Sequence, residues 1–137
     1  MRALLGDKTI ESRDKALAIA TAAQDRKGQN LTIIQVDGQS SYTDFIVIVT
    51  AYSERMTNAI ADTVIDDLKK KSEQRPLSRE GDGTWILVDY GDVVLHVFHE
   101  DARAYYDLDR LWADATRIPV PPPTQQVIEP PRLMSSP

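Results

Sequence analysis

Two carboxylates and one imidazole stand close together within residues 85–98, and they are the side chains of this chain best suited to chemistry. Asp89 and Asp92 flank a Tyr-Gly pair, and His96 follows four residues later. Oxygen and nitrogen donors at short range can hold a divalent cation or exchange protons. The alternative, which we favour, is that both aspartates shape a turn and that His96 fills a satisfied hydrogen-bonding position.

A predicted β-hairpin positions these side chains. Its strands are residues 85–89 and 92–98, and Tyr90-Gly91 suits a two-residue turn because glycine accepts a positive φ. Alternation then pairs Asp89 with Asp92, and it pairs Trp85 with His96. One face therefore carries Trp85, Asp89, Asp92 and His96. The other face carries an aliphatic surface suited to burial under a helix: Ile86, Val88, Val93, Leu95 and Val97.

Aromatic residues near this face suggest binding. Trp85 could anchor a protein interface, since an aromatic side chain with a polar rim is the usual energetic centre of one. It could equally be a core or dimer tryptophan. Tyr105, Tyr106 and Trp112 cannot all enter one narrow core stripe, so we expect at least one of these rings near the surface.

Other catalytic motifs have little support in the sequence. The segment at residues 80–83, Glu-Gly-Asp-Gly, is acidic and leads into a strand, so we interpret it as a hairpin loop rather than a phosphate-binding loop. No serine or threonine lies in a recognisable nucleophile elbow. The absence of cysteine excludes thiolate nucleophiles, disulfides and cysteine zinc sites.

The remaining elements predict an α/β fold with a single mixed five-stranded sheet flanked by helices. A helix is expected at residues 12–27, capped by Ser12 and stopped by Gly28. Ser53 can cap a second helix with an apolar stripe from Met56 to Leu68, and a third is expected at residues 100–113, with Ala104, Leu108 and Leu111 facing inward. The strands are residues 31–36, 44–50, 75–78, 85–89 and 92–98, of which 44–50 is central and covered on both faces.

Composition predicts one domain at residues 12–117. Residues 1–11 are expected to be flexible, and residues 118–137 form a proline-rich tail expected to be disordered. The net charge of −5 argues against broad adhesion to nucleic acid. No apolar run approaches a membrane span, and no secretory signal is recognised, so a cytoplasmic location is expected.

The residues resemble the Iojap-related ribosomal silencing factor family over residues 16–112. The similarity lies in these segments: Ser40-Ser41-Tyr42-Thr43-Asp44-Phe45, Ser53-Glu54-Arg55, Ile60-Ala61-Asp62, Pro76-Leu77 with Glu80-Gly81, residues 85–98, and Arg103, Tyr106, Leu108, Leu111 and Trp112.

That resemblance implies a nucleotidyltransferase-like fold without transferase activity, as a homodimer or monomer. It implies binding to the large ribosomal subunit, mainly ribosomal protein L fourteen, and a steric block to small-subunit joining. Translation would be repressed, and late maturation of the large subunit affected. No cofactor or metal is expected. The candidate partner-binding residues are Trp85, Asp89, Asp92, His96 and Tyr106.

Two other functions remain open at the level of sequence. One is a metal-dependent nucleotidyltransferase in which Asp89 and Asp92 hold the metal, although the glycine-serine loop of active relatives is missing. The other is a self-associating scaffold with Trp85 buried between identical subunits.

Overall fold

The centre of the fold is β2 (Phe45–Ala51), in which every residue is buried. The structure is a computed structural model that describes residues 10–40 and 42–122. β2 runs parallel to β5 (Val93–His99) and antiparallel to β1 (Gln29–Gln35). The prediction of a central strand covered on both faces is confirmed.

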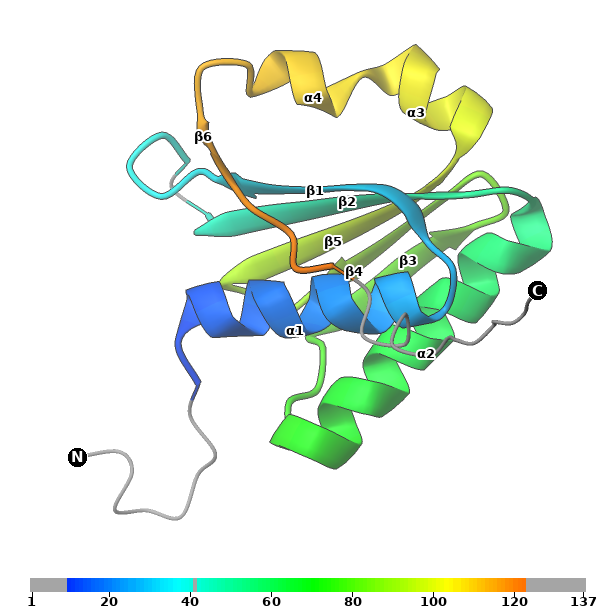
Figure 1. Cartoon of the computed structure of the whole chain (residues 1–137), viewed down its shortest axis with the longest axis horizontal. Helices are drawn as coiled ribbons and strands as arrows, with labels where there is room; N and C mark the ends of the chain where they lie inside the picture. The colour runs from blue at the N-terminus through cyan, green and yellow to red at the C-terminus, as the bar shows by residue number, and fades with distance from the viewer. Residues whose placement is uncertain (1–9, 41, 123–137) are drawn as a thin grey trace, which may run out of the picture.

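Across the described residues, six strands form one mixed sheet in the order β3-β4-β5-β2-β1-β6 (Figure 1). The outer strands are β3 (Ser78–Asp82), β4 (Trp85–Asp89) and β6 (Thr116–Ile118). The predicted α/β class with a mixed sheet is confirmed, whereas the predicted count of five strands is wrong. β6 was missed because three residues are too few to give a periodic pattern. It pairs antiparallel with β1 and buries Ile118.

Two helices, α1 (Ser12–Asp25) and α2 (Glu54–Ser72), cover one face of the sheet (Figure 1). Ser53 caps α2 as predicted, because its side chain accepts a hydrogen bond from the Met56 N–H at 3.2 Å. The predicted cap of α1 is wrong: Glu11 holds that position, without a side-chain capping bond. Within residues 10–40 and 42–122, no helix is long and apolar enough to cross a membrane.

Gly28 follows α1 as predicted. Close packing explains the need for glycine at this position better than a role in ending the helix does. The left-handed residue after α1 is Lys27, with φ of 68°. The Gly28 N–H donates to the Ala23 carbonyl at 2.8 Å. A Cβ added at Gly28 would lie 2.4 Å from Val49 Cγ2, so only glycine fits between α1 and β2 without displacement.

The predicted third helix is broken into α3 (Glu100–Tyr106) and α4 (Leu108–Leu111), which lie over the opposite face (Figure 1). The break is at Asp107, which adopts a left-handed conformation with φ of 49°. Ala104 in α3 and Leu111 in α4 are exposed, so the inward orientation predicted for these two residues is wrong. The buried contact in α3 comes from Ala102, and Leu108 and Trp112 pack partly buried against the same small cluster.

The edge strand β3 lies further along the chain than predicted. The predicted strand covers residues 75–78 and the predicted loop residues 80–83, whereas Glu80, Gly81 and Asp82 belong to β3. Its mostly exposed sequence lacks an apolar alternation, which explains the error. Gly81 has φ of 85°, and a Cβ there would meet the Trp85 carbonyl oxygen at 2.2 Å.

The chain continues past the predicted domain end at residue 117. Ile118 is buried in β6, and Val120 packs partly buried against the core that α1 and α2 share with the sheet. Of the residues predicted to be flexible (1–11) or disordered (118–137), residues 1–9 and 123–137 lie outside the described residues, whereas Ile118 belongs to a strand.

We predict that Gly28→Ala lowers the free energy of unfolding by about 2–3 kcal/mol, because the added methyl group overpacks the contact with Val49. Urea unfolding would measure the loss. Gly38→Ala is the matched control: it meets nothing within 4 Å and carries only the cost of its positive φ, about 1 kcal/mol. Equal losses in the two variants would contradict the packing argument.

Candidate functional site

The β4–β5 hairpin has a different register from the predicted one. Its turn is Gly91-Asp92 rather than Tyr90-Gly91, since the Tyr90 N–H donates to the Val93 carbonyl at 2.8 Å. Asp89 therefore pairs with Val94, so the predicted pairing of the two aspartates is wrong. The register differs by two residues, and an even shift leaves each strand residue on the same face.

The division into two faces is accordingly confirmed for the strand residues. The aliphatic residues Ile86, Val88, Val93, Leu95 and Val97 all belong to the core beneath α1 and α2. Opposite them, the pairs Trp85 with Phe98, Leu87 with His96 and Asp89 with Val94 form what we call the outer face of the hairpin.

Asp92 does not join the outer face. It lies in the turn, where its Oδ1 accepts a hydrogen bond from Lys15 Nζ at 2.8 Å. Lys15 belongs to α1, which covers the opposite side of the sheet. Asp89 is also engaged locally, because its Oδ1 accepts the Gly91 N–H at 2.7 Å. The structure thus separates the two predicted carboxylates, and each holds a structural contact.

Four rings form an aromatic cluster on the outer face: Trp85, His96, Phe98 and Tyr106. The centroid of the Trp85 ring lies 4.5 Å from that of Tyr106 and 5.0 Å from that of Phe98. The rings of His96 and Phe98 stack with an interplanar angle of 9°. Ring pairs at these distances stabilise the fold by more than the burial of their apolar surface alone. The cluster holds Trp85 half-buried, with part of its indole accessible.

His96 orients the indole of Trp85. It is 7% exposed, and burial lowers its pKa to about 4, so the imidazole is neutral at pH 7. Its Nδ1 accepts a hydrogen bond from Trp85 Nε1 at 3.1 Å, which assigns the imidazole proton to Nε2. A base this weak is poorly matched to proton transfer near neutral pH. The geometry instead favours a role in fixing Trp85.

A shallow pocket of about 240 Å³ opens beside Trp85, lined by Glu80, Gly81, Trp85 and Leu87. Its lining is mainly apolar, and Glu80 adds a carboxylate. Over residues 10–40 and 42–122, no three histidine, aspartate or glutamate side chains gather in an arrangement that could hold a metal ion. The pocket can therefore take an apolar side chain with a polar or basic neighbour.

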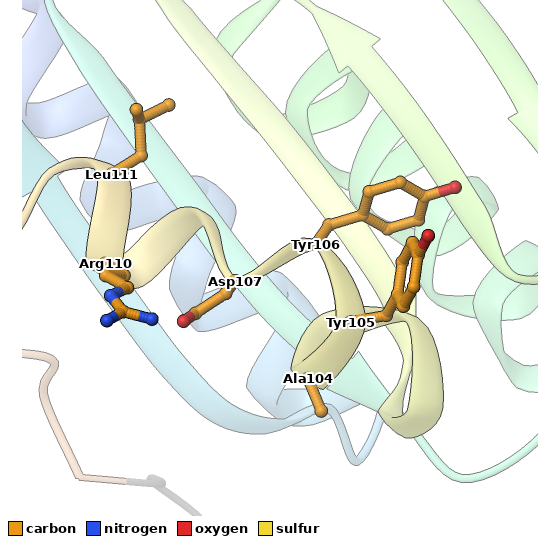
Figure 2. A pocket seen from close by; sticks show the side chains of 6 residues that line it. All are labelled: Ala104, Tyr105, Tyr106, Asp107, Arg110 and Leu111. Atoms are coloured by element: carbon orange, nitrogen blue, oxygen red, sulfur yellow. The ribbon is translucent and has the colours of Figure 1, made fainter.

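A second hollow lies over α3 and α4, where the prediction of an exposed ring is confirmed. It measures about 590 Å³ and is lined by Ala104, Tyr105, Tyr106, Asp107, Arg110 and Leu111. In Figure 2 the two tyrosine rings project side by side from the end of α3, while Arg110 and Leu111 project from α4. Tyr105 is 81% exposed and Leu111 is 70% exposed. Tyr106 belongs both to this hollow and to the aromatic cluster, so the two surfaces are continuous.

Sequence reasoning missed three contributors to this region. Leu77 is exposed beside the hairpin turn, where a Cβ at Gly91 would meet its Cδ1 at 3.3 Å. Glu80 was assigned to a loop although it lines the Trp85 pocket. All three residues were named within the family resemblance without a role in this region; the Arg103 side chain contacts α4 and two strands. No local pattern identifies these roles, because all three depend on partners distant in the sequence.

We predict that His96 makes folding stability depend on pH. Its folded-state pKa of about 4 lies below the unfolded value of 6.5, so between these values the unfolded chain binds a proton that the native protein excludes. Stability should fall by about 3 kcal/mol as pH drops from 6.5 to 4. Urea unfolding across this range should show that His96→Gln removes this component, whereas His99→Gln retains it. Identical pH profiles for wild type and His96→Gln would contradict the assignment.

A protein-family model described as "Ribosomal silencing factor during starvation" matches residues 9–134. A ribosomal silencing factor from Halalkalibacterium halodurans is 37% identical over 113 residues, which cover 78% of this chain and 93% of the relative. The chloroplastic Iojap protein of Zea mays is 31% identical over 126 residues, covering 88% of this chain and 55% of the maize protein.

The fold is likewise similar to solved structures. A crystal structure of a protein from Chromobacterium violaceum superposes with a TM-score of 0.73 and 28% identity, over 85% of this chain and 98% of that protein. The family model spans nearly the whole chain, including every described element. The chain therefore belongs to the ribosomal silencing factor family, as its resemblance to Iojap-related proteins had indicated.

Proposed function

We propose that this protein silences translation by binding the large ribosomal subunit through ribosomal protein L fourteen and sterically blocking the joining of the small subunit. The observation that carries the proposal is the partly exposed aromatic cluster on the sheet face that α3 and α4 cover only in part, in a chain of the ribosomal silencing factor family. The proposal includes an effect on late large-subunit maturation, a cytoplasmic location, and a homodimer or monomer as the resting state.

Trp85 has the environment of an interface anchor. Its indole is oriented by His96 and flanked by Tyr106, while Leu87 extends the apolar surface and Glu80 forms part of the rim. Aromatic residues of this kind, surrounded by polar groups that exclude water, commonly carry most of the energy of a protein interface. A rigid anchor also loses little conformational entropy on binding.

The candidate residues divide by what they can contact. Trp85 and Tyr106 present ring surface to a partner, and Asp89 lies at the polar rim of the same face. His96 is too buried for more than a supporting role. Asp92 enters the proposed interface only at its edge, because Lys15 holds its carboxylate on the α1 side.

The mechanism requires no chemical step. A specific interface of roughly 800 Å² per partner can be tight while the rest of a small domain projects into space that another subunit needs. The net charge of −5 favours a basic ribosomal protein over RNA phosphates as the contact. The proposed function includes a nucleotidyltransferase-like fold in a protein that has no transferase activity.

We predict that Trp85→Ala weakens cosedimentation with isolated large subunits about 30-fold, which corresponds to about 2 kcal/mol for an interface anchor. Small subunits should not sediment the protein. Tyr42→Ala is the matched control, because Tyr42 is exposed and precedes β2 at the opposite end of the sheet from Trp85. Equal binding by wild type and Trp85→Ala would reject the proposed face, and binding to neither subunit would reject the ribosomal function.

A calorimetric titration separates the proposed function from the rival nucleotidyltransferase function. Calorimetric titration of the purified protein with magnesium and nucleoside triphosphate should give no stoichiometric heat, because the Asp89 and Asp92 carboxylates are engaged by Gly91 and Lys15. Stoichiometric binding that Asp92→Ala abolishes would instead support the enzyme.

A further inference from the structure

The side chain of Arg103 joins α3 to three other elements. Its Nε and Nη2 donate to the two carboxylate oxygens of Asp109 in α4, at 3.2 and 3.1 Å. Nη2 also donates to Thr32 Oγ1 at 2.9 Å in β1. Nη1 donates to Thr50 Oγ1 at 3.0 Å in β2 and to the carbonyl of Asn30. These five contacts match the five N–H donors of a guanidinium, so the group is fully satisfied.

Besides Arg103, Arg117 of β6 holds the α4 end of the α3–α4 segment, donating to the carbonyls of Trp112 and Asp109 at 2.8 and 3.0 Å, whereas α3 has few other contacts. The two helices contain 7 and 4 residues, too few to be stable without tertiary contacts. In these two described helices, Ala102 is the only buried residue. Leu108 and Trp112 add partly buried contacts to the cluster beneath. A polar clamp at Arg103 therefore has a large share in placing this segment on the sheet.

The clamp that Arg103 forms with Asp109, Thr32 and Thr50 is close to the proposed docking face around Trp85 and Tyr106. Arg103 and Tyr106 are three positions apart on α3, so they lie on neighbouring parts of one helix surface. Tyr106 in turn packs 4.5 Å from Trp85, between ring centroids. Beyond it, Tyr105, Arg110 and Leu111 line the hollow of Figure 2. A displacement of α3 would separate Tyr106 from Trp85 and open this hollow.

We propose that Arg103 is a positioning residue for docking: it sets Tyr106 against Trp85 and thereby joins the aromatic cluster and the α3–α4 hollow into one continuous partner-binding surface. This inference rests on the proposed function. With a side chain that is 14% exposed, Arg103 acts through the residues it places rather than by touching a partner. Lysine cannot replace it, because a single ammonium group with three donors does not reproduce the planar fork.

The first test is nuclear magnetic resonance of the full chain. Wild type should show nuclear Overhauser contacts between the rings of Trp85 and Tyr106, with the two indole signals assigned from a Trp112→Phe variant. Arg103→Lys should lose these contacts. Arg79→Lys is the matched control, since Arg79 also bridges elements, contacting Asp62 and Asn58 of α2. Ring contacts preserved in Arg103→Lys would overturn the proposal.

The second test is cosedimentation with large subunits, performed well below the unfolding temperature of each variant. Arg103→Lys should bind at least tenfold more weakly than wild type, and Arg79→Lys should bind equally well. A purely structural role would lower the unfolding temperature but leave binding by the folded protein unchanged, and that result would overturn the proposal. If wild type binds neither subunit, the proposed function fails, while the ring contacts still decide whether Arg103 positions Tyr106.

A milder variant keeps the inference testable if Arg103→Lys does not fold. Asp109→Asn retains the arginine and its strand partners but removes the charge and one acceptor oxygen from the α4 side of the clamp. It should weaken the Trp85–Tyr106 contacts and subunit binding in the same direction, by a smaller factor. Wild-type behaviour in both measurements would overturn the role of the clamp.

Discussion

The parallel pairing of β2 with β5 is the constraint on which the remaining structure depends. Nearly all residues of both strands are buried, so the pair must be covered on both faces. A parallel connection also requires a crossover, which α2 provides before the chain returns through β3 and β4. The long helices α1 and α2 cover one face, and the short α3–α4 segment covers part of the other.

The candidate site arises because the α3–α4 segment is shorter than α1 and α2 and covers only part of its face of the sheet. α3 and α4 shield the outer face over β1, β2 and β5, and Tyr106 at the end of α3 contacts Trp85 on β4. The outer side chains of β4 are consequently half-buried rather than enclosed. An aromatic cluster at such a boundary is rigid and still partly accessible, which is the combination that an interface anchor needs.

Two shielded ion pairs fix the positions of elements in the described part of the chain. Lys15 ties α1 to the hairpin turn through Asp92, and Arg103 ties α3 and α4 to the sheet. Both ion pairs are largely shielded from solvent. Removing one partner of a shielded ion pair lowers stability more than removing one partner of an exposed pair. The pairs of Lys70 with Asp66 and Lys71 with Asp67 on the exposed side of α2 contribute far less.

Elements with strong local signals could be predicted from the order of the amino acids alone. Ser53 and the apolar stripe after it specify α2, and the continuous apolar run of β2 specifies a buried strand. The faces of the hairpin were also predictable, because alternation survives an error of two residues in register. The family resemblance came from the same local segments.

Features that depend on partners far along the chain became visible only in the folded protein. β3 and β6 exist because neighbouring strands pair with them, although their own sequences carry no clear strand pattern. The break at Asp107 and the outward turn of Leu111 accompany the contacts of Arg103 with Asp109 and Thr50. The hairpin register places Asp92 in the turn, where it pairs with Lys15, 77 positions away in the sequence. Local periodicity reports which face a residue occupies, whereas such long-range polar contacts arise only once the chain has packed.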